Sequence, residues 1–376
     1  MAVLSDAQRE AGWTIVKLGD IATLVMGTSP KSSDVVDYPL GIPLLNGPAE
    51  FTDKYPAPVK WTEKGIRFSE PGDILFCVRA TLGKMNFSDQ KYAIGRGLAA
   101  IRGVDELHTR YIYYTLLSTM ESILRNANGT IYLSVTKSDV ENFEIPLPPE
   151  DALERIAGIL GSLDDKIEAN TRLIQTLSDY CVALVDSLKL FEGSRESTLG
   201  EIISFSPKVK KPAGEEYQFI DMSSLPTMGP VPETISSKSS WNGAKFENGD
   251  TLFARITPCL ENGKTAIAMG LGDEPACGST EFIVMRANTP EQVILPYGIA
   301  RCDKFRQEAM SHMIGSTGRQ RVKWQDLANI PVSVPSESDM QKIEKSSDIF
   351  GYFEALRKEN LQLAETRDAL IKRLIG

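Results

Sequence analysis

Residues 143–156 read FEIPLPPEDALERI, and residues 330–343 read IPVSVPSESDMQKI. Each stretch begins with the alternation of apolar and polar side chains that is typical of a strand. Proline follows, which cannot donate to a strand ladder, and the acidic residues behind it favour the positive end of a helix dipole. Both stretches predict a strand that stops abruptly and a helix that starts at once. The chain contains this boundary twice, 187 residues apart.

Four segments of the chain recur in the same order, at offsets of 177 to 187 residues. They indicate two tandem copies of about 185 residues, far longer than the ~20–50 residues of a solenoid unit. The matched pairs are LGDI (18–21) with LGEI (199–202), EPGDILFCVR (70–79) with ENGDTLFARI (247–256), AIGRGLAAIR (93–102) with ACGSTEFIVMR (276–286), and VTKSDVENFEIPLPP (135–149) with VKWQDLANIPVSVPS (322–336).

The first part of each copy is rich in glycine, proline and threonine, and turn residues interrupt short strand-like runs such as 73–78 and 251–254. Helices are predicted at 107–125 and 292–313. This mixture indicates a compact α+β domain in each copy.

The second part of each copy is predicted to be a long helix with a heptad seam. Apolar side chains step by four and three residues, as in a coiled coil and unlike a broad amphipathic face. The first seam is Ile156, Leu160, Leu163, Ile167, Asn170, Ile174, Leu177, Cys181, Leu184 and Leu188, and the second is Ile349, Phe353, Leu356, Asn360, Leu363, Arg367, Leu370 and Leu374.

Asn170 and Asn360 occupy the same place when the two seams are superposed. A polar residue inside an apolar seam lowers stability but fixes register and orientation. The alternative is that each asparagine lies at the solvated edge of a wide apolar stripe. Because both helices belong to one chain, the expected partner of each is the other, in an antiparallel coiled coil.

The predicted fold class is α+β with a pseudo-twofold internal repeat, in which two long helices separate two tandem α+β domains. The predicted parts are a first domain at 1–149, a central helix at 150–194, a second domain at 195–336 and a C-terminal helix at 337–376. A helix of about 35 residues spans about 50 Å. Two domains at a fixed separation suit a bipartite duplex site, much as dimeric DNA readers impose a half-site spacing.

Composition narrows the class of protein. No apolar run approaches the ~18 residues of a membrane span, and MAVLSDAQREAGW at the N-terminus predicts no signal peptide. The five cysteines form no CxxC pair, so we expect reduced thiols in a cytoplasmic protein without a metal site. The net charge of −9 is concentrated at 150–200, where 5 basic and 10 acidic residues lie, so the near-neutral domains can still present a basic face.

Motifs for catalysis are missing from the sequence. There is no GxxxxGK[ST], the glycine turn at 95–97 is too short for a nucleotide site, and the prolines at 148–149 lack the flanking residues of an amino-methyltransferase motif. His108 and His312 have no partner motif, and the acidic pair at 164–165 is expected to be solvated. We therefore expect no catalytic residues in this chain.

Several stretches together resemble the specificity (S) subunit of type I restriction-modification systems. The resemblance covers essentially the whole chain, although the second copy has FSPKVKKP (205–212) where the first has its GTSP loop. The stretches that carry it are GWTIVKLGDIATLVMGTSPKS (12–32), PGDILFCVRATLGKMNFSDQ (71–90), GRGLAAIR (95–102) and NGTIYLSVTKSDVENFEIPLPPEDALERIAGILGSLDDKIEANTRLIQTL (128–177).

This resemblance implies that each domain is a target recognition domain for one half of a split site in double-stranded DNA. It implies that the coiled coil docks methyltransferase (M) subunits and that restriction (R) subunits join for cleavage. The chain itself is then non-catalytic and binds no cofactor, and S-adenosylmethionine and base flipping belong to the M subunits. No membrane is involved.

DNA contacts need basic or small polar side chains on loops, and for each candidate an ordinary surface turn is the alternative. The segment 255–257 with Lys264 is the expected counterpart of 79–84, and Asn128-Gly129-Thr130 is the expected, less basic counterpart of 316–321. The candidates are Thr28, Ser29, Lys31, Arg79, Thr81, Lys84 and Arg96 in the first domain, and Lys208, Lys210, Arg255, Thr257, Lys264, Arg319, Gln320 and Arg321 in the second. The expected coiled-coil and partner interface is Leu160, Leu163, Ile167, Asn170, Ile174, Leu177, Phe353, Leu356, Asn360, Leu363 and Leu370.

Two other functions stay open from the sequence. A coiled-coil scaffold that binds only proteins would have the same helices, and salt-sensitive retention of DNA by the assembled complex would distinguish it from a DNA reader. An enzyme acting alone, such as a methyltransferase or nuclease, would show its own activity when isolated.

Overall fold

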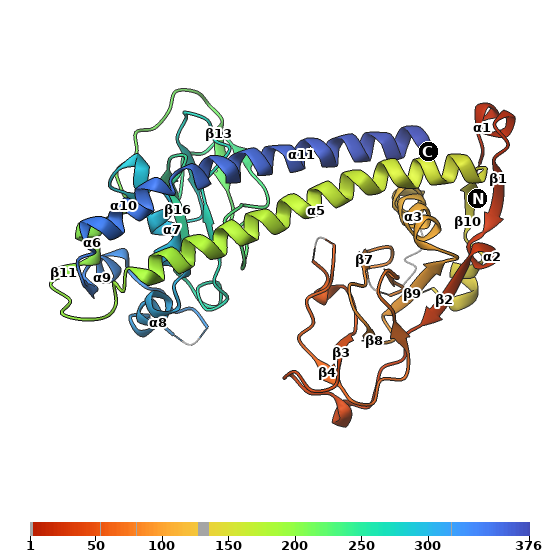
Figure 1. Cartoon of the computed structure of the whole chain (residues 1–376), viewed down its shortest axis with the longest axis horizontal. Helices are drawn as coiled ribbons and strands as arrows, with labels where there is room; N and C mark the ends of the chain where they lie inside the picture. Colours follow the sequence, from red (N-terminus) through yellow and green to blue (C-terminus); the bar gives the residue numbers. More distant parts are fainter. Residues whose placement is uncertain (1–2, 53, 80, 127–134, 317) are drawn as a thin grey trace. The chain divides into compact units, whose positions relative to one another are not determined.

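The computed structural model describes the chain apart from residues 1–2, 53, 80, 127–134 and 317, and apart from the side chains of 120–126. It divides into two compact units, one formed by Met1–Asp165 with Leu363–Gly376 and the other by Lys166–Gln362. Each unit combines one α+β domain with a part of both long helices (Figure 1).

The domain of the first unit consists of short strands and one long helix. Its elements are α1 (Asp6–Glu10), β1 (Thr14–Lys17), α2 (Leu18–Ile21), β2 (Ala22–Met26), η1 (Ser32–Asp34), β3 (Ile42–Leu45), η2 (Pro48–Glu50), β4 (Trp61–Thr62), β5 (Phe68–Ser69), β6 (Ile74–Cys77), β7 (Met85–Phe87), β8 (Tyr92–Ile94), β9 (Leu98–Gly103), α3 (Glu106–Asn126), α4 (Lys137–Glu141) and β10 (Glu144–Leu147). One sheet is antiparallel with the order β2-β9-β6-β7, and the other has the order β4-β3-β8-β5 with β3 parallel to β8. Helix α3 lies against β9, and β1 pairs with β10.

The domain of the second unit repeats this arrangement. Its elements are β11 (Ser197–Thr198), α6 (Leu199–Ile202), β12 (Ile203–Phe205), β13 (Tyr217–Ile220), β14 (Ser236–Lys238), β15 (Ala244–Phe246), β16 (Thr251–Ala254), β17 (Thr265–Ile267), β18 (Ala276–Gly278), β19 (Phe282–Ala287), η3 (Pro290–Gln292), α7 (Ile294–Arg301), α8 (Asp303–Ser311), α9 (Trp324–Ala328), β20 (Pro331–Val332) and α10 (Glu337–Lys345). The sheets have the orders β12-β19-β16-β17 and β14-β13-β18-β15, with β13 parallel to β18, and β11 pairs with β20. The same strand order in both units confirms the tandem α+β repeat.

The repeated motifs EPGD and ENGD form the same ion pair in the two domains. Asp73 accepts hydrogen bonds from Nε and Nη2 of Arg102 at 2.5 and 2.8 Å, and Asp250 accepts both equivalent bonds from Arg286 at 2.6 Å. Both aspartates are buried in the sheet, at 1% and 2% exposure. The strong similarity of these motifs therefore has a structural cause, because each ties a strand start to the neighbouring strand.

The long helices are α5 (Glu150–Ser187) and α11 (Asp348–Leu374). In the first unit Asp164 of α5 bonds Arg367 of α11, and in the second unit Asn170 of α5 bonds Asn360 of α11. The residue number falls in one helix as it rises in the other, so the predicted antiparallel pairing is confirmed. Every position of the two predicted seams is buried or half-buried.

The first strand-to-helix boundary lies where the proline pair predicts it. Strand β10 ends at Leu147, α5 begins at Glu150, and the carbonyl oxygen of Pro149 accepts from the N–H groups of Ala152 and Leu153. Helix α5 ends at Ser187, short of the predicted 194, because Lys189 turns the chain with a φ of 52°.

The C-terminal helix predicted at 337–376 is two helices, which corrects the expectation of one. Helix α10 ends at Lys345 and α11 begins at Asp348. Between them, Ser346 Oγ donates to the carbonyl oxygen of Lys342 at 2.9 Å, and the backbone carbonyl oxygen of Ser347 accepts from the N–H of Phe350 at 3.1 Å. Serine side chains compete for backbone groups and so end helices.

The predicted helix at 292–313 also divides, into α7 and α8. The break is at Cys302, whose ψ of 128° is extended. Almost all of α7 is buried, whereas α8 buries only Phe305 and Ala309. A single straight helix could not be buried over its first half and exposed over its second, and the bend at Cys302 lets α7 lie in the core while α8 lies at the surface.

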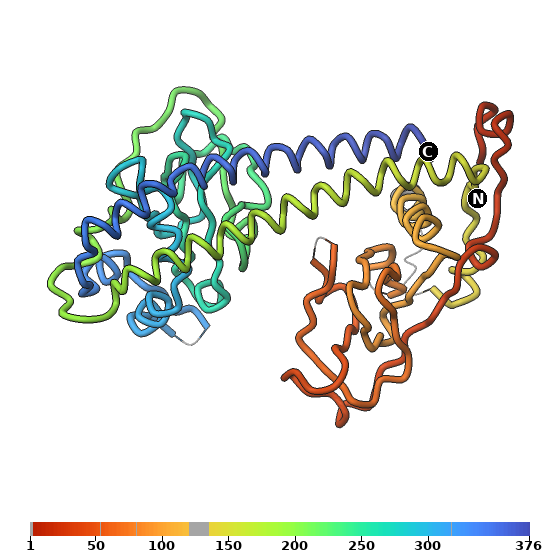
Figure 2. The backbone as a smooth tube through the Cα atoms, viewed as in Figure 1, coloured from red at the N-terminus to blue at the C-terminus, as the bar shows by residue number. Residues whose placement is uncertain are grey.

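The two ends of the described chain meet in the first unit (Figure 2). Ser5 caps α1, and Gln8 within α1 donates from Nε2 to the carbonyl oxygen of Ile375 at 3.3 Å. This contact satisfies the carbonyl group of the residue directly after α11, where the carbonyl groups have no partner inside the helix.

Candidate nucleic-acid interface

Loops of the first domain gather at one end of the sheet β2-β9-β6-β7. Because neighbouring strands are antiparallel, β2 and β6 end where β9 and β7 begin. The segment after β2, the turn between β6 and β7 and the turn before β9 therefore share this end. They contain all seven residues predicted for this domain, namely Thr28, Ser29, Lys31, Arg79, Thr81, Lys84 and Arg96.

Backbone contacts hold these loops together. The N–H of Arg96 donates to Ser29 Oγ at 3.1 Å, and the N–H of Val78 donates to the carbonyl oxygen of Gly97 at 2.9 Å. A Cβ at Gly97 would collide with the carbonyl oxygen of Asn46, so glycine is needed for this close approach. The loop backbones are thus fixed, whereas Arg79, Thr81, Lys84 and Arg96 on them are exposed.

Cationic side chains of this sheet end face solvent. Arg79, Lys84 and Arg96 are exposed, and none of them forms an ion pair with any carboxylate that the structure describes. Lys31, the seventh candidate, is also exposed and directly precedes η1. Cations without a carboxylate partner are available for phosphate groups.

The second domain has a different arrangement at the equivalent end. Isolated bridges join Arg321 to Ile256 and to Ile314, so the backbone at 320–322 lies beside 255–257. The N–H of Gln320 donates to Thr257 Oγ1 at 3.1 Å, and Thr257 is buried. The structure therefore places Arg255, Thr257, Gln320 and Arg321 together, with Arg319 exposed beside them.

Glu281 lies among these residues and was not among the predicted ones. Its carboxylate accepts from Nε of Arg321 at 2.9 Å and from Nη2 at 2.9 Å, and it lies 3.8 Å from Nε of Arg255. In the sequence, the repeat ACGSTEFIVMR contains Glu281 directly before β19. Glu281 occupies the position of Gly97 in the first domain, because its carbonyl oxygen accepts from the N–H of Arg255 as that of Gly97 accepts from the N–H of Val78.

Arg255 is not the counterpart of Arg79, which corrects the expected match. Strand pairing places Cys77 opposite Leu98 and Ala254 opposite Phe282, so Arg255 follows the paired residue directly, as Val78 does. A shift of one residue moves a side chain to the other face of a strand.

Lys264 does match Lys84, because its carbonyl oxygen accepts from Ala254 as that of Lys84 accepts from Cys77. Its ammonium, however, donates to the carbonyl oxygen of Met222 at 3.0 Å, so it holds a loop of its own domain. Lys208 and Lys210 are exposed in the loop after β12. The segment Asn128-Gly129-Thr130 lies outside the described residues.

The predicted coiled-coil residues pack inside the chain's own helix pair. Leu160 and Leu370 belong to an apolar cluster of the first unit, and Ile174, Leu177 and Phe353 to one of the second. These side chains are used within the chain, so a partner bound along the helices would meet their outward-facing neighbours. The remaining seam residues of the prediction are likewise buried or half-buried: Leu163, Ile167, Asn170, Leu356, Asn360 and Leu363.

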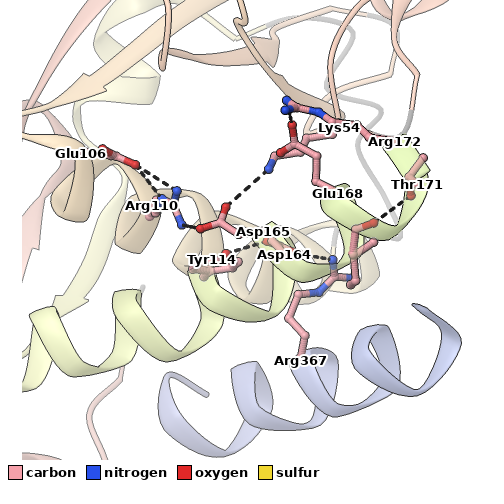
Figure 3. A network of polar contacts seen from close by, with 11 residues as sticks. Lys54, Glu106, Arg110, Tyr114, Asp164, Asp165, Glu168, Thr171, Arg172 and Arg367 are labelled. Carbon is pink, nitrogen blue, oxygen red and sulfur yellow. Dashed lines mark hydrogen bonds and ion pairs between the residues drawn. The ribbon is translucent and has the colours of Figure 1, made fainter. Parts of the chain in front are cut away.

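The acidic pair at 164–165 is not simply solvated, contrary to expectation (Figure 3). Asp164 accepts from the hydroxyl of Tyr114 at 2.6 Å and from Nη1 of Arg367 at 2.7 Å, and its side chain is 14% exposed. Asp165 pairs with Arg110 of α3 at 2.9 Å. This network joins α3, α5 and α11 within the first unit. Arg367 at a seam position was its only sign in the sequence.

No group of three or more His, Cys, Asp or Glu side chains in the described part of the chain is arranged to hold a metal ion. His108 instead contacts Asp105 at 2.8 Å. Among the helices that the structure describes, none has the length and apolarity needed to cross a membrane.

Comparison with known proteins shows what this chain is similar to. Residues 10–179 match the model of the type I restriction modification DNA specificity domain. A putative type I restriction enzyme MjaX specificity subunit of Methanocaldococcus jannaschii is 38% identical over 159 residues, which are 42% of this chain and 37% of that protein. The EcoAI and EcoEI specificity subunits of Escherichia coli are matched over 33% and 49% of their lengths. The chain thus spans less than half the length of these three relatives.

Two further relatives extend over the whole chain. The MjaVIII specificity subunit of M. jannaschii is 23% identical and aligns over 96% of this chain and 92% of its own. The crystal structure of a type I restriction-modification system S subunit from M. genitalium is 18% identical, with a TM-score of 0.56 over 100% of this chain and 98% of that one. This likeness shows that the two-unit fold is shared. Residues 10–179 thus resemble a DNA specificity domain, and the chain as a whole shares the fold of the M. genitalium S subunit.

Proposed function

We propose that this chain is the DNA-recognition subunit of a type I restriction-modification complex and that each α+β domain reads one half of a bipartite site. The observation that carries the proposal is the DNA specificity domain at 10–179, whose strand order recurs in the second unit. The exposed cations at one end of the sheet β2-β9-β6-β7 support it, because phosphate contacts supply most of the affinity of a protein for DNA.

The same proposal assigns the chemistry to other chains. Methyltransferase subunits bound along the helix pair supply S-adenosylmethionine and methyl transfer, and restriction subunits supply cleavage. This chain is then a non-catalytic reader that binds no cofactor and works in the cytoplasm. Its support is that the relatives named above are specificity subunits.

The test is an exchange of one domain. The full chain is produced with its methyltransferase subunits, residues 1–149 are replaced by the corresponding domain of a relative, and modified bases are mapped in the host genome. We expect one half of the recognised sequence to change while the other half stays. A change in both halves, or in neither, would contradict the proposal.

Salt dependence separates this function from a protein scaffold. A reader that neutralises six to ten phosphates loses about 10³–10⁵ in affinity between 50 and 200 mM salt. If the assembled complex binds DNA without such dependence, or only as well as the methyltransferase subunits alone, then the chain is a scaffold.

A further inference from the structure

Glu281 and Arg321 form a side-on ion pair at the end of β19. Nε of Arg321 donates to both carboxylate oxygens at 3.1 and 2.9 Å, and Nη2 donates to Oε1 at 2.9 Å. The arginine side chain is 40% exposed and the glutamate 24%. The pair therefore lies at the surface with its carboxylate turned inward.

The backbone around Arg321 is anchored on two sides. Arg321 and Ile314 exchange N–H to carbonyl hydrogen bonds of 3.0 and 2.9 Å, and Val322 donates its N–H to the carbonyl oxygen of Arg255 at 3.0 Å. On the other side of the bridge, Thr257 donates its N–H to the carbonyl oxygen of Gln320 at 3.1 Å. The position of the arginine is thus fixed before any ligand binds, which reduces the entropy lost on binding.

The remaining donors of Arg321 form a defined edge. A guanidinium has five N–H groups, and Glu281 accepts hydrogen bonds from Nε and from the N–H of Nη2 on the same side. Nη1 makes only a 3.4 Å contact, to the carbonyl oxygen of Arg319. The end formed by Nη1 and Nη2 therefore keeps two outward N–H groups, the spacing of which matches the O6 and N7 acceptors of guanine in the major groove.

Electrostatics favours a base over a phosphate at this edge. The carboxylate of Glu281 lies behind the guanidinium of Arg321 and neutralises its positive charge. A phosphate group bound to the outward edge of Arg321 would be repelled by this carboxylate. The edge of a base carries no net charge, so the carboxylate does not oppose it. Arg319 next to it is exposed, and no carboxylate among the described residues pairs with it, so Arg319 suits a phosphate better.

The equivalent end of the first domain has no arginine paired with a glutamate among the described residues. Gly97 stands where Glu281 stands, and Arg79, Lys84 and Arg96 have no carboxylate behind them in the described structure. Two domains with the same strand order thus present different donor sets, which is what an asymmetric site requires.

We propose that Arg321 reads a guanine in the half-site of the second domain and that Glu281 is its positioning residue. This inference rests on the proposed DNA-recognition function and adds to it the base class and the two residues that select it.

The test compares variants of the full chain assembled with its methyltransferase subunits, by selection from duplexes of random sequence. Arg321→Lys keeps the charge but lacks the planar guanidinium that can hold Glu281 on one side and two base acceptors at its end. We expect the preference for guanine at one position to fall about 5- to 150-fold. Glu281→Gln should weaken the same preference, at the same position, and leave the affinity for random DNA equal or higher. Arg319→Ala is the matched control, which should weaken binding to all sequences alike.

The outcomes distinguish this inference from the function on which it rests. If the wild-type complex selects no sequence, the proposed function fails. If it selects a bipartite site and Arg321→Lys, with an unchanged melting temperature, keeps every guanine preference, the inference alone fails. A shift at that position caused by Arg319→Ala and not by Arg321→Lys would likewise overturn it.

Discussion

Asn170 donates from Nδ2 to Oδ1 of Asn360 at 2.9 Å, so the two asparagines that occupy the same place in the two seams bond each other. The same Nδ2 lies 2.7 Å from Oε2 of Glu359, and Asn170 is 2% exposed. Asn170 therefore lies inside the seam and not at its solvated edge. A polar contact buried between apolar layers penalises every register in which the two residues do not meet.

Replacing Asn170 by aspartate should destabilise the helix pair. The isosteric Asn170→Asp change removes the donor and places a second carboxylate beside Glu359, so we expect a loss of about 2–3 kcal/mol in the free energy of unfolding at pH 7. Asn360→Asp is the matched control, because it keeps the acceptor for Asn170, and it should cost less than about 1 kcal/mol. Urea denaturation measures both. Equal losses in the two variants would show that the hydrogen bond does not set the stability of this layer.

Removing one buried aspartate should destabilise mainly its own domain. Asp73→Asn leaves Arg102 without its charge partner, so it should lower the free energy of unfolding by about 2–4 kcal/mol. Asp250→Asn leaves Arg286 paired with Glu247, which lies 2.8 Å from Nη1, so its loss should be smaller. Hydrogen exchange followed by peptide mass spectrometry can locate the loss. We expect faster exchange in 70–103 for the first variant and in 247–287 for the second, and exchange that rises equally in both domains would contradict the expectation.

The hydroxyl of Tyr114 should matter more than that of its neighbour. Tyr114→Phe removes a 2.6 Å bond to Asp164, and hydrogen bonds to charged groups contribute about 1.5–3 kcal/mol. Tyr113→Phe is the matched control, since the described structure gives its hydroxyl no hydrogen bond. Thermal melting of both variants gives the comparison. If the two variants have the same melting temperature, the hydrogen bond from Tyr114 to Asp164 adds nothing to stability.

The thiols predict a pattern of reactivity. Burial raises the pKa of Cys77 to about 11 and of Cys181 to about 12, whereas Cys259 is half-buried. Because the thiolate is the reactive form, native protein at pH 8 should react quickly with a disulfide reagent at Cys259 alone. Cys259→Ser should abolish the fast phase, and a fast phase that persists would show that another thiol is accessible.

The same shifts predict a loss of stability in alkali. Thiols whose pKa is raised in the folded state stabilise it fully below their unfolded pKa of about 9, and this contribution disappears as the pH rises towards 11–12. Burial also raises the pKa of Tyr113 to about 12, which adds to the loss above pH 10. Unfolding midpoints should therefore stay level from pH 8 to about pH 9 and fall from there to pH 11, and a constant midpoint over the whole range would contradict these assignments.

Local chemistry was enough to predict a large part of this molecule. The duplication, the seams of both long helices and the helix start after Pro149 depend on residue type and spacing within short windows. The exposed cations of the first domain were found in the same way, because a basic residue beside a turn signal tends to be exposed. The two serines at 346–347 were a local signal too, and they end α10 in a stretch where a single helix was expected.

Residue type and spacing along the chain were enough to predict the plan of the protein: two copies, each a strand-rich domain followed by a helix with a seam. Tertiary structure alone decided which side chains meet, because partners such as Asp164 and Arg367 are 203 positions apart along the chain. Strand pairing also decided that Arg255 corresponds to Val78 and not to Arg79, since successive residues of a strand point to opposite faces. Glu281 and Arg321, which are 40 positions apart along the chain, are likewise brought together only by folding. Spacing along a chain predicts elements, whereas the contacts between elements depend on how they pack.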